Sequence, residues 1–359
     1  MKEKVVLFGA SLEGDMAYKE LKEKYEIICY LDNDPQKKGN TLNGLKVLSP
    51  NDLGEIDNNE KNITLIVCSD SYEEIKNQLI QLGYINIEKF SPSKREKIKK
   101  YWGKGIQLNP SLAGVYGMGS GEEFEIPYRH FWEVKHLLSI IKFDKNMNVL
   151  EIGSGNGRWA MEIGPLVNKY VGIDLNRDMV EYAKSSMEEY GVNNVEFYTN
   201  EITELETKLT FDIIYFSGVT QYLEDPEMIK AISKIREISK ENTIVIDRST
   251  INANKRYINS TDSYFSIYRT PKEIENIFLK MGYKCFYKNR SYPFIRGSKW
   301  IEKIPIVNNI TFSQLKKKNR IFFYIMKASS TIIEKIYPLR ALDDIPTSHS
   351  HDFFIFKKG

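Results

Sequence analysis

The chain has 359 residues, and its 51 lysines and arginines against 48 aspartates and glutamates give a net charge of +3. This near balance argues against the global positive field of a nucleic-acid-binding protein. With 42% hydrophobic and 28% charged residues, the composition is that of a globular protein rather than a disordered or membrane-embedded one. The length favours two domains, because a single core usually stops growing at about 250–300 residues.

The three cysteines, Cys29, Cys68 and Cys285, each lie in a short apolar run that is typical of a strand. Their odd number and wide spacing favour buried free thiols over disulfides or a zinc site. Free thiols fit a reducing cytoplasm, and the opening MKEKVVLFGA reads as a strand rather than a signal segment. We therefore predict a cytoplasmic protein.

Residues 1–92 are predicted to form a small parallel α/β domain, because short apolar runs alternate with helical patterns. The expected strands are 5–8, 27–31, 45–48, 63–68 and 87–90, with helices at 13–24 and 72–82. A glycine turn, LFGASLEGD, follows the first strand, and Asp32 ends the second.

This first segment resembles the Rossmann-like domain at the front of some sugar acetyltransferases and other glycan-biosynthesis proteins, where a nucleotide sugar can bind. Ser11 stands where a dinucleotide fingerprint has its second glycine, which argues against close approach of a pyrophosphate. Two interpretations stay open. The domain is either a nucleotide or nucleotide-sugar pocket, or a packing and oligomerisation module.

Residues 93–127 are predicted to be a linker and lid. The lysine-rich SKREKIKKYWGKG is more typical of a solvated helix face than of a nucleic-acid patch. Tyr116 and Arg129 flank the glycine-rich GVYGMGSGEEFEIP, which is either a lid over a ligand or an ordered surface loop.

Residues 128–359 are predicted to form a second and more complete α/β domain. After a helical pattern from Tyr128, strands are expected at 148–152, 170–173, 195–198, 211–216, 243–247, 283–289 and 353–356. Helices are expected at 178–190, 226–239 and 271–281, so the pattern predicts a doubly wound sheet.

The segment VLEIGSGNGRW follows the first of these strands and carries glycines at 153, 155 and 157. Glycines in such a turn can take positive φ and let a ligand touch the backbone. Glu151 precedes them, and Asp174 ends the next strand, where a carboxylate can accept both ribose hydroxyls of a nucleoside. Glu201 ends the third strand and can accept a hydrogen bond from an adenine amino group.

With these motifs, residues 128–359 resemble class I S-adenosylmethionine-dependent methyltransferases of the small-molecule branch. The resemblance implies a seven-stranded Rossmann-like sheet and S-adenosyl-L-methionine as cofactor. It also implies that the fourth-strand segment FDIIYFSGVTQYLED turns Tyr222 toward the methyl group. The cofactor-binding residues that it implies are Glu151, Gly153, Ser154, Gly155, Gly157, Asp174, Leu175, Glu201, Ile202, Ser217 and Gly218.

Other functions are less well supported. Methyltransferases acting on nucleic-acid bases commonly have an Asn/Asp-Pro-Pro-aromatic loop where this chain has SGVTQY, so we predict no nucleic-acid partner. Ser11 and Glu151 disfavour a nicotinamide-dependent oxidoreductase. The alternative from another class is a non-catalytic nucleotide-binding scaffold or regulatory module.

Methylation of a sugar hydroxyl benefits from a general base. In the class I topology the last strand starts at the catalytic edge of the sheet, so His349 and His351 are the candidate bases. Tyr222 and Asp247 are held in reserve as catalytic residues. His349, His351 and Asp352 have the ligand types of a metal site, but no further acidic cluster accompanies them, and we predict no metal.

Residues 292–350 are predicted to be an insert that caps the acceptor site. Within 316–337, basic residues precede apolar ones at helical spacing. This pattern favours a helix packed on the core or on a second subunit, with peripheral membrane contact as the alternative. We predict an O-methyltransferase for a sugar, nucleotide sugar or glycan in polysaccharide biosynthesis, with another small metabolite as the alternative acceptor.

Overall fold

The computed structural model describes residues 2–55, 63–69, 71–108, 125–261, 264–293, 323–325, 327–328 and 349–359. The chain divides into two compact units, Met1–Lys97 and Ile98–Gly359. Tyr116, most of the predicted lid and almost all of the predicted 292–350 insert lie outside the described residues, and so does most of the 316–337 segment.

The first unit has a six-stranded sheet in the order β3-β4-β2-β1-β5-β6. Its neighbouring strands are parallel except for the β3–β4 pair. Apolar side chains of α1 pack on one face of the sheet and those of α2 on the other. The elements are β1 Lys4–Phe8, α1 Leu12–Leu21, β2 Glu26–Leu31, β3 Thr41–Leu42, β4 Leu45–Leu48, β5 Thr64–Val67, α2 Tyr72–Gln81 and β6 Ile87–Lys89.

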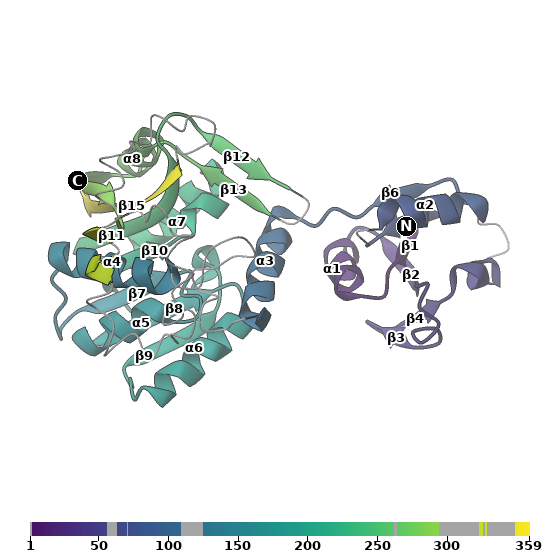
Figure 1. Ribbon diagram of the computed structural model, residues 1–359, viewed down its shortest axis with the longest axis horizontal. Coiled ribbons are helices and arrows are strands. Elements are labelled where there is room, and N and C mark those ends of the chain that lie inside the picture. Colours follow the sequence, from purple (N-terminus) through teal and green to yellow (C-terminus); the bar gives the residue numbers. More distant parts are fainter. Residues whose placement is uncertain are drawn as a thin grey trace. The chain divides into compact units, whose positions relative to one another are not determined.

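The second unit has a seven-stranded sheet in the order β14-β15-β11-β10-β7-β8-β9 (Figure 1). All strands are parallel except β15, which pairs antiparallel with both neighbours. The predicted α/β fold with a seven-stranded sheet is confirmed. The strands are β7 Asn148–Ile152, β8 Lys169–Asp174, β9 Val195–Thr199, β10 Phe211–Ser217, β11 Ser239–Asn252, β14 Tyr283–Arg290 and β15 His349–Lys358.

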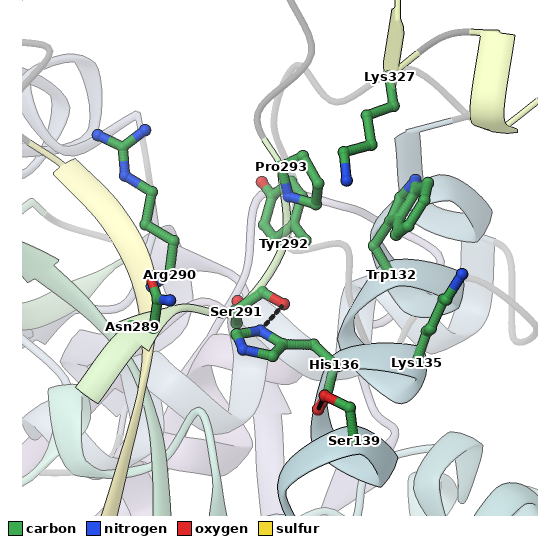
Figure 2. Close-up of a pocket in the computed structure, with 10 residues that line it drawn as sticks. All are labelled: Trp132, Lys135, His136, Ser139, Asn289, Arg290, Ser291, Tyr292, Pro293 and Lys327. Carbon is green, nitrogen blue, oxygen red and sulfur yellow. Dashed lines mark hydrogen bonds between the residues drawn. The ribbon is translucent and has the colours of Figure 1, made fainter. Parts of the chain in front are cut away.

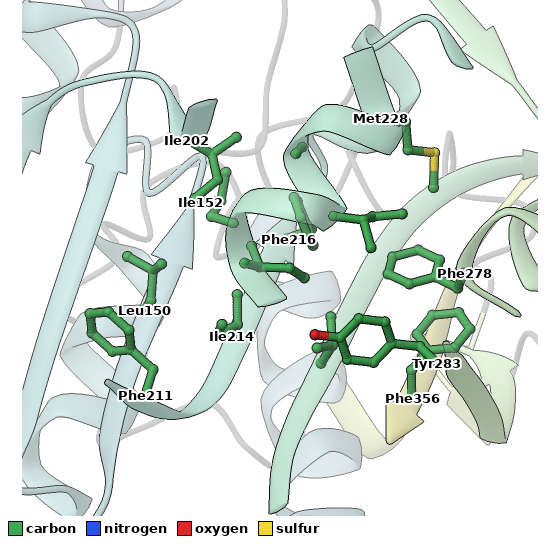
Figure 3. Packing of buried hydrophobic residues seen from close by; sticks show 14 of the residues in the cluster. Leu150, Ile152, Ile202, Phe211, Ile214, Phe216, Met228, Phe278, Tyr283 and Phe356 are labelled. Atoms are coloured by element: carbon green, nitrogen blue, oxygen red, sulfur yellow. The ribbon is translucent and has the colours of Figure 1, made fainter. Parts of the chain in front are cut away.

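Helices cover both faces of this sheet. Apolar residues of α4, α5 and α6 pack on one face, and those of α7 and α8 pack on the other, where Phe278 stacks on Phe356 (Figure 3). Burial of both faces explains why the central strands read as nearly continuous apolar runs. The helices are α3 Lys94–Leu108, α4 Glu125–Ile140, α5 Arg158–Ile163, α6 Arg177–Glu189, α7 Asp225–Glu237 and α8 Pro271–Lys280.

Two outer features differ from the sequence expectation. Strand β11 continues to Asn252, well beyond the expected end at Asp247, because antiparallel pairing with β15 extends to Asn252 opposite His349. The polar residues in this extension do not give an apolar strand signal. A hairpin of β12 (Tyr257–Ser260) and β13 (Phe265–Tyr268) was also not expected.

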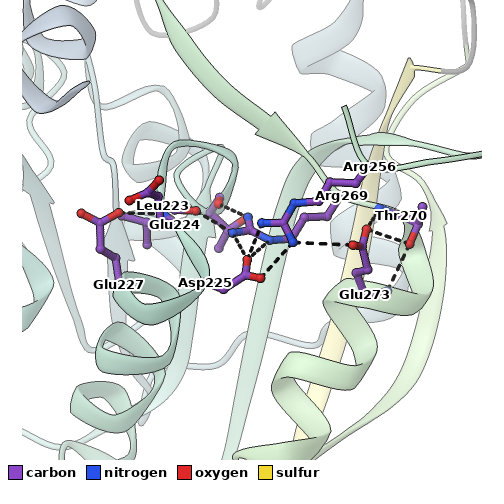
Figure 4. A network of polar contacts seen from close by, with 9 residues as sticks. Leu223, Glu224, Asp225, Glu227, Arg256, Arg269, Thr270 and Glu273 are labelled. Atoms are coloured by element: carbon purple, nitrogen blue, oxygen red, sulfur yellow. Dashed lines mark hydrogen bonds and ion pairs between the residues drawn. The ribbon is translucent and has the colours of Figure 1, made fainter. Parts of the chain in front are cut away.

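The hairpin is held to the loop after β10 by an arginine network (Figure 4). Arg256 makes two hydrogen bonds to the Asp225 carboxylate, at 2.9 and 2.8 Å. Arg269 also contacts Asp225 and donates to the carbonyl oxygens of Thr220 and Leu223. The Arg256 hydrogen bond, with help from Arg269, lowers the pKa of Asp225 to about 2. The loop that carries Tyr222 is thereby held by Arg269 at Thr220, before Tyr222, and at Leu223, after it.

Candidate active site

The glycine loop connects β7 to α5 at the carboxyl edge of the second sheet. Gly153, Gly155 and Gly157 all have positive φ, at 80°, 51° and 80°. A Cβ at Gly153 would lie 2.2 Å from the Val219 side chain, so the loop has no room for a side chain there. Backbone N–H groups of Gly153 and Ser154 both donate to the Ile173 carbonyl, which joins the loop to β8.

Asp174 ends β8 beside this loop. Its Oδ2 accepts the Gly155 N–H at 2.9 Å, and its Oδ1 accepts the Asn176 N–H at 2.9 Å. Burial raises the pKa of Asp174, and these backbone hydrogen bonds oppose the rise. Each carboxylate oxygen has a further lone pair, so Asp174 can accept ribose hydroxyls while it holds the loop.

Glu151 at the end of β7 is fully buried. Tyr170 donates to its Oε2 at 2.7 Å, whereas Oε1 makes no hydrogen bond to a described residue, although the Ser217 hydroxyl lies nearby. Burial raises the pKa of Glu151 to about 8, against the hydrogen bond from Tyr170. The Ser154 hydroxyl is likewise buried without a partner among the described residues.

Glu201 follows β9 and begins the short 3-10 helix Ile202–Glu204. The Thr203 hydroxyl donates to its Oε1 at 2.9 Å, and Ile202 is buried. Leu175 is partly exposed beside Asp174. These three predicted residues therefore lie past the ends of β8 and β9, on the far side of β7 from β10.

Ser217 and Gly218 lie at the end of β10, and Gly218 has positive φ. Tyr222 follows in the short 3-10 helix Thr220–Tyr222, and its ring contacts Tyr264 of the hairpin at 6.0 Å between centroids. Burial raises the pKa of Tyr222 to about 12. A phenol with this pKa is protonated at neutral pH and is therefore a poor base.

Helix α3 brings Trp102 to the same place, a contribution that the sequence analysis missed. The Trp102 ring packs on Met179 at the start of α6 and meets Tyr222 edge-on at 6.3 Å. Asn176 donates to the Lys99 carbonyl. A tryptophan in an otherwise lysine-rich segment was the signal that could have placed this helix against the site.

His351 lies on β15 opposite Thr250, and its Nδ1 is 2.9 Å from the Thr250 hydroxyl. Burial, with the nearby charges of Arg129 and Arg158, holds the pKa of His351 well below its usual value. His349 instead packs against the rings of Tyr257 and Tyr268, and burial lowers its pKa too. Both imidazoles are neutral at pH 7, but among the described residues only His351 has a polar partner that can orient it.

Asp247 on β11 is fully buried, and its carboxylate accepts hydrogen bonds from the Thr220 hydroxyl at 2.8 Å and the Ser249 hydroxyl at 2.7 Å. Burial raises the pKa of Asp247 to about 6. These bonds tie the loop after β10 to β11. Asp247 therefore has hydrogen bonds that stabilise the fold. Its role as a base stays a prediction.

Four residues from three elements, α4, α5 and β11, form a charged cluster near His351. Glu133 of α4 accepts from Arg129, Arg248 and the Ser291 hydroxyl, and it also pairs with Arg158. Burial alone would raise the pKa of Glu133, but the Arg129 and Arg158 charges outweigh burial and lower it. Glu133 is therefore ionised at neutral pH.

An open depression of about 440 Å³ lies between α4 and the end of β14 (Figure 2). Lys135, Arg290 and Lys327 contribute basic side chains, and none of the described lining residues is acidic. Ser291 belongs to both this depression and the Glu133 cluster.

The described residues contain no group of three His, Cys, Asp or Glu that is arranged to hold a metal ion. In the same residues, no helix is both long and apolar enough to cross a membrane. The polar atoms left over at the glycine loop are instead suited to an organic ligand. Glu151 Oε1 and Ser154 Oγ fit the amino and carboxylate ends of a methionine, beside a loop that excludes side chains.

Comparison with known proteins decides the identity of this fold. Residues 143–291 match a family model described as a methyltransferase domain. The second unit carries a methyltransferase domain. The cofactor of this domain is S-adenosylmethionine, and the predicted enzyme class and cofactor are both confirmed. Residues 1–89 match a separate family model, described as the N-terminal domain of C2185-like proteins.

Individual relatives share only part of their sequence with the methyltransferase domain. An uncharacterized methyltransferase, YcgJ of Bacillus subtilis, is 33% identical over 95 residues, or 26% of this chain and 37% of that protein. Ribosomal RNA small subunit methyltransferase A of Mycoplasma mycoides is 22% identical over 52% of this chain and 66% of that protein. The chain thus spans less than two thirds of each of these relatives.

Among solved structures, magnesium protoporphyrin IX methyltransferase of Synechocystis with bound S-adenosylmethionine gives a TM-score of 0.45 at 12% identity. The match covers 74% of this chain and 98% of the other.

Proposed function

We propose that the protein transfers a methyl group from S-adenosylmethionine to a hydroxyl group of a sugar, nucleotide sugar or glycan. The observation that carries this proposal is the position of His351. It is a neutral imidazole on β15, held by Thr250 at the carboxyl edge of the sheet. An amine or carboxylate acceptor does not need a base, whereas a hydroxyl benefits from one by about 10²–10⁴ in rate.

The strand order supports a division of the site into two halves. The predicted cofactor residues end β7, β8, β9 and β10, which are consecutive in the sheet. His351 is on β15, separated from β10 by β11. A methyl group held at the Ser217–Gly218 end of the cofactor half would therefore face an acceptor on the β11 and β15 side.

In this proposal Glu151, Ser154 and the glycine loop hold the methionine part of the cofactor, and Asp174 holds the ribose. When bound, S-adenosylmethionine would supply a methyl group on a sulfonium: an acceptor oxygen can attack the methyl carbon, and the sulfur leaves as the thioether of S-adenosylhomocysteine. His351 donates Nδ1–H to the Thr250 hydroxyl, which leaves a lone pair on Nε2. That nitrogen takes the proton of the acceptor hydroxyl, and the aromatic rings of Trp102 and Tyr222 exclude water.

The sugar class of the acceptor is supported by the first unit, which resembles the front domain of sugar acetyltransferases. Its Asp32 ends the second strand, where dinucleotide-binding folds have an acidic residue, and the Asp32 carboxylate accepts the Ala10 N–H at 2.8 Å and pairs with Lys37. Cys29, Cys68 and Cys285 are free thiols, which fits a cytoplasmic site for the reaction.

A test uses the full-length protein with S-adenosylmethionine that carries a deuterated methyl group. Candidate acceptors are nucleotide sugars, oligosaccharides and, because of the relative in Mycoplasma, ribosomal RNA. Mass spectrometry should find a labelled methyl ether in a sugar product and an equal amount of S-adenosylhomocysteine. Label in RNA or on nitrogen would contradict the proposed acceptor, and no S-adenosylhomocysteine with any acceptor would favour a binding scaffold.

A further inference from the structure

Three arginine side chains converge on one buried carboxylate beside the proposed base. Glu133 is fully buried, with Arg129 Nε at 3.2 Å and Arg248 Nη2 at 2.7 Å from its Oε1. Arg158 Nη1 lies 3.1 Å from its Oε2. The Ser291 hydroxyl adds a fourth contact at 2.9 Å. The hydrogen bonds from described residues all go to Oε1, whereas Oε2 has only the ion pair with Arg158.

The cluster holds more positive than negative charge. Among the described residues, three guanidiniums face one carboxylate, and the Arg158 and Arg248 side chains are each 5% exposed. No other acidic side chain in this part of the chain forms an ion pair with these arginines. Like charges that are buried together are costly, so a negatively charged ligand would be stabilised here.

The cluster also has unused hydrogen-bond donors. Arg129 bonds to described residues only through Nε, and the Nη1 of Arg248 bonds to none of them. A Cβ at Gly218 would lie 3.6 Å from Arg248 Nη1. The Arg248 guanidinium therefore lies next to the end of β10, where the methyl group is expected.

These donors belong to the acceptor half of the site. Arg248 is on β11, and Ser291 follows β14. In the sheet, both strands lie on the other side of β10 from β8, which ends at the predicted cofactor residue Asp174. The Arg129 guanidinium lies over the Tyr292 ring at 5.5 Å, and this ring stacks on His351 at 5.9 Å. The basic depression in Figure 2 opens next to Ser291 and Tyr292, so an anion would be attracted along its approach.

We propose that Arg129, Arg248 and Arg158 form an oxyanion subsite for a phosphate or carboxylate on the methyl acceptor. The inference rests on the proposed function and narrows it to acidic acceptors, such as sugar phosphates or uronic acids. Guanidinium groups suit this role because their paired N–H donors match two oxygens of a phosphate or carboxylate. Glu133 acts as a positioning residue that holds the three side chains apart.

The experiment uses the full chain saturated with S-adenosylhomocysteine, so that the cofactor carboxylate is already bound. Inorganic phosphate, glucose 6-phosphate, glucuronate and uncharged glucose are titrated by calorimetry. We expect the three anions to bind and glucose not to bind. Arg129→Gln should weaken binding of glucose 6-phosphate or glucuronate by about tenfold or more, the effect of losing a charge-assisted hydrogen bond. Its affinity for S-adenosylhomocysteine should stay within about twofold.

Arg236→Gln is the matched control, because Arg236 is exposed near the end of α7 and should leave anion binding unchanged. Arg129→Lys keeps the positive charge but lacks the paired N–H donors of the guanidinium. This variant replaces Arg129→Gln if the Gln variant does not fold. Equal binding of glucose and the anions, or wild-type anion affinity in both variants, would overturn the subsite. A loss of S-adenosylhomocysteine affinity with unchanged anion binding would assign the arginine to the cofactor carboxylate instead.

Failure of the proposed function has a different signature. A protein that binds S-adenosylhomocysteine and anions but methylates no hydroxyl would contradict O-methylation while leaving the anion subsite in place. A protein that methylates only uncharged sugars would retain the proposed function and refute the subsite.

Discussion

At the scale of single residues, two buried carboxyl groups at one sheet edge differ because their surroundings differ. Glu151 has one hydrogen bond and a pKa of about 8. Asp247 has two hydroxyl donors and a pKa of about 6. Burial raises both pKa values, and the number of donors limits the rise. Glu151 is thus largely neutral at pH 7 in the absence of a cationic ligand.

The first prediction follows from this protonation of Glu151. The folded-state pKa of Glu151 is above the ordinary glutamate pKa of 4.5, so its contribution to stability is full below pH 4.5 and is lost as the pH rises toward about 8. Glu151→Gln removes this titration. The melting temperature of the variant should therefore fall less than that of the wild type over this pH range. Parallel melting curves for the two proteins against pH would refute the raised pKa.

The second prediction concerns the base. His351→Gln should lower turnover of a hydroxyl acceptor by about 10²-fold or more, with cofactor affinity unchanged. His349→Gln should have a smaller effect, because the His349 ring packs on Tyr257 and Tyr268 and has no polar partner. Wild-type turnover should be constant from neutral pH downward until well below pH 6.5, since burial and Arg129 keep the pKa of His351 low. Full activity of His351→Gln would remove it as the base.

Distance along the sequence determined which members of the candidate site could be predicted. The glycine loop, Asp174 and Glu201 were predictable because each follows a strand within a few residues. The Glu133 cluster was not, since α4, α5, β11 and the end of β14 supply its members, and only the tertiary fold brings them together.

At the scale of elements, the hairpin β12–β13 and helix α3 show why the rest was not predicted. The hairpin depends on Arg256 and Arg269 reaching Asp225, which is distant in the sequence. The α3 residues that pack within the second unit are marked by two aromatic residues, Tyr101 and Trp102, in a polar segment. Neither element has an apolar periodicity that sets it apart from a loop.

The third prediction compares the two arginines of Figure 4. Arg269→Gln should reduce the free energy of unfolding by about 3 kcal/mol or more, because its side chain is 2% exposed and its loss leaves buried groups unpaired. Arg256→Gln should cost less than about 1 kcal/mol, because that side chain is one-third exposed. Urea denaturation of both variants checks this order. Equal losses would contradict a distinct role for the buried arginine.

At the scale of the whole molecule, each unit has its own sheet and its own covering helices. The sequence predicted two α/β domains because the alternation of strands and helices occurs twice. It placed the boundary at residue 92, and the compact units meet at Lys97 and Ile98.

The fourth prediction is that a protein lacking residues 1–92 still folds and binds S-adenosylmethionine. The truncation keeps α3, whose Trp102 packs on Met179. Circular dichroism and calorimetry on the truncated protein check folding and binding. An insoluble product or loss of cofactor binding would contradict the division of the chain. Loss of acceptor turnover alone would support a nucleotide-sugar role for the first unit.

The central claim is that the ends of β7, β8 and β9 bind S-adenosylmethionine, and titration calorimetry on Asp174→Ala tests it most directly. Asp174 would carry two ribose hydrogen bonds worth about 2–4 kcal/mol in total, so affinity should fall about 30-fold or more. Glu188→Ala, an exposed carboxylate on α6, should bind as the wild type does. A folded Asp174→Ala protein with wild-type affinity would contradict the assigned cofactor site.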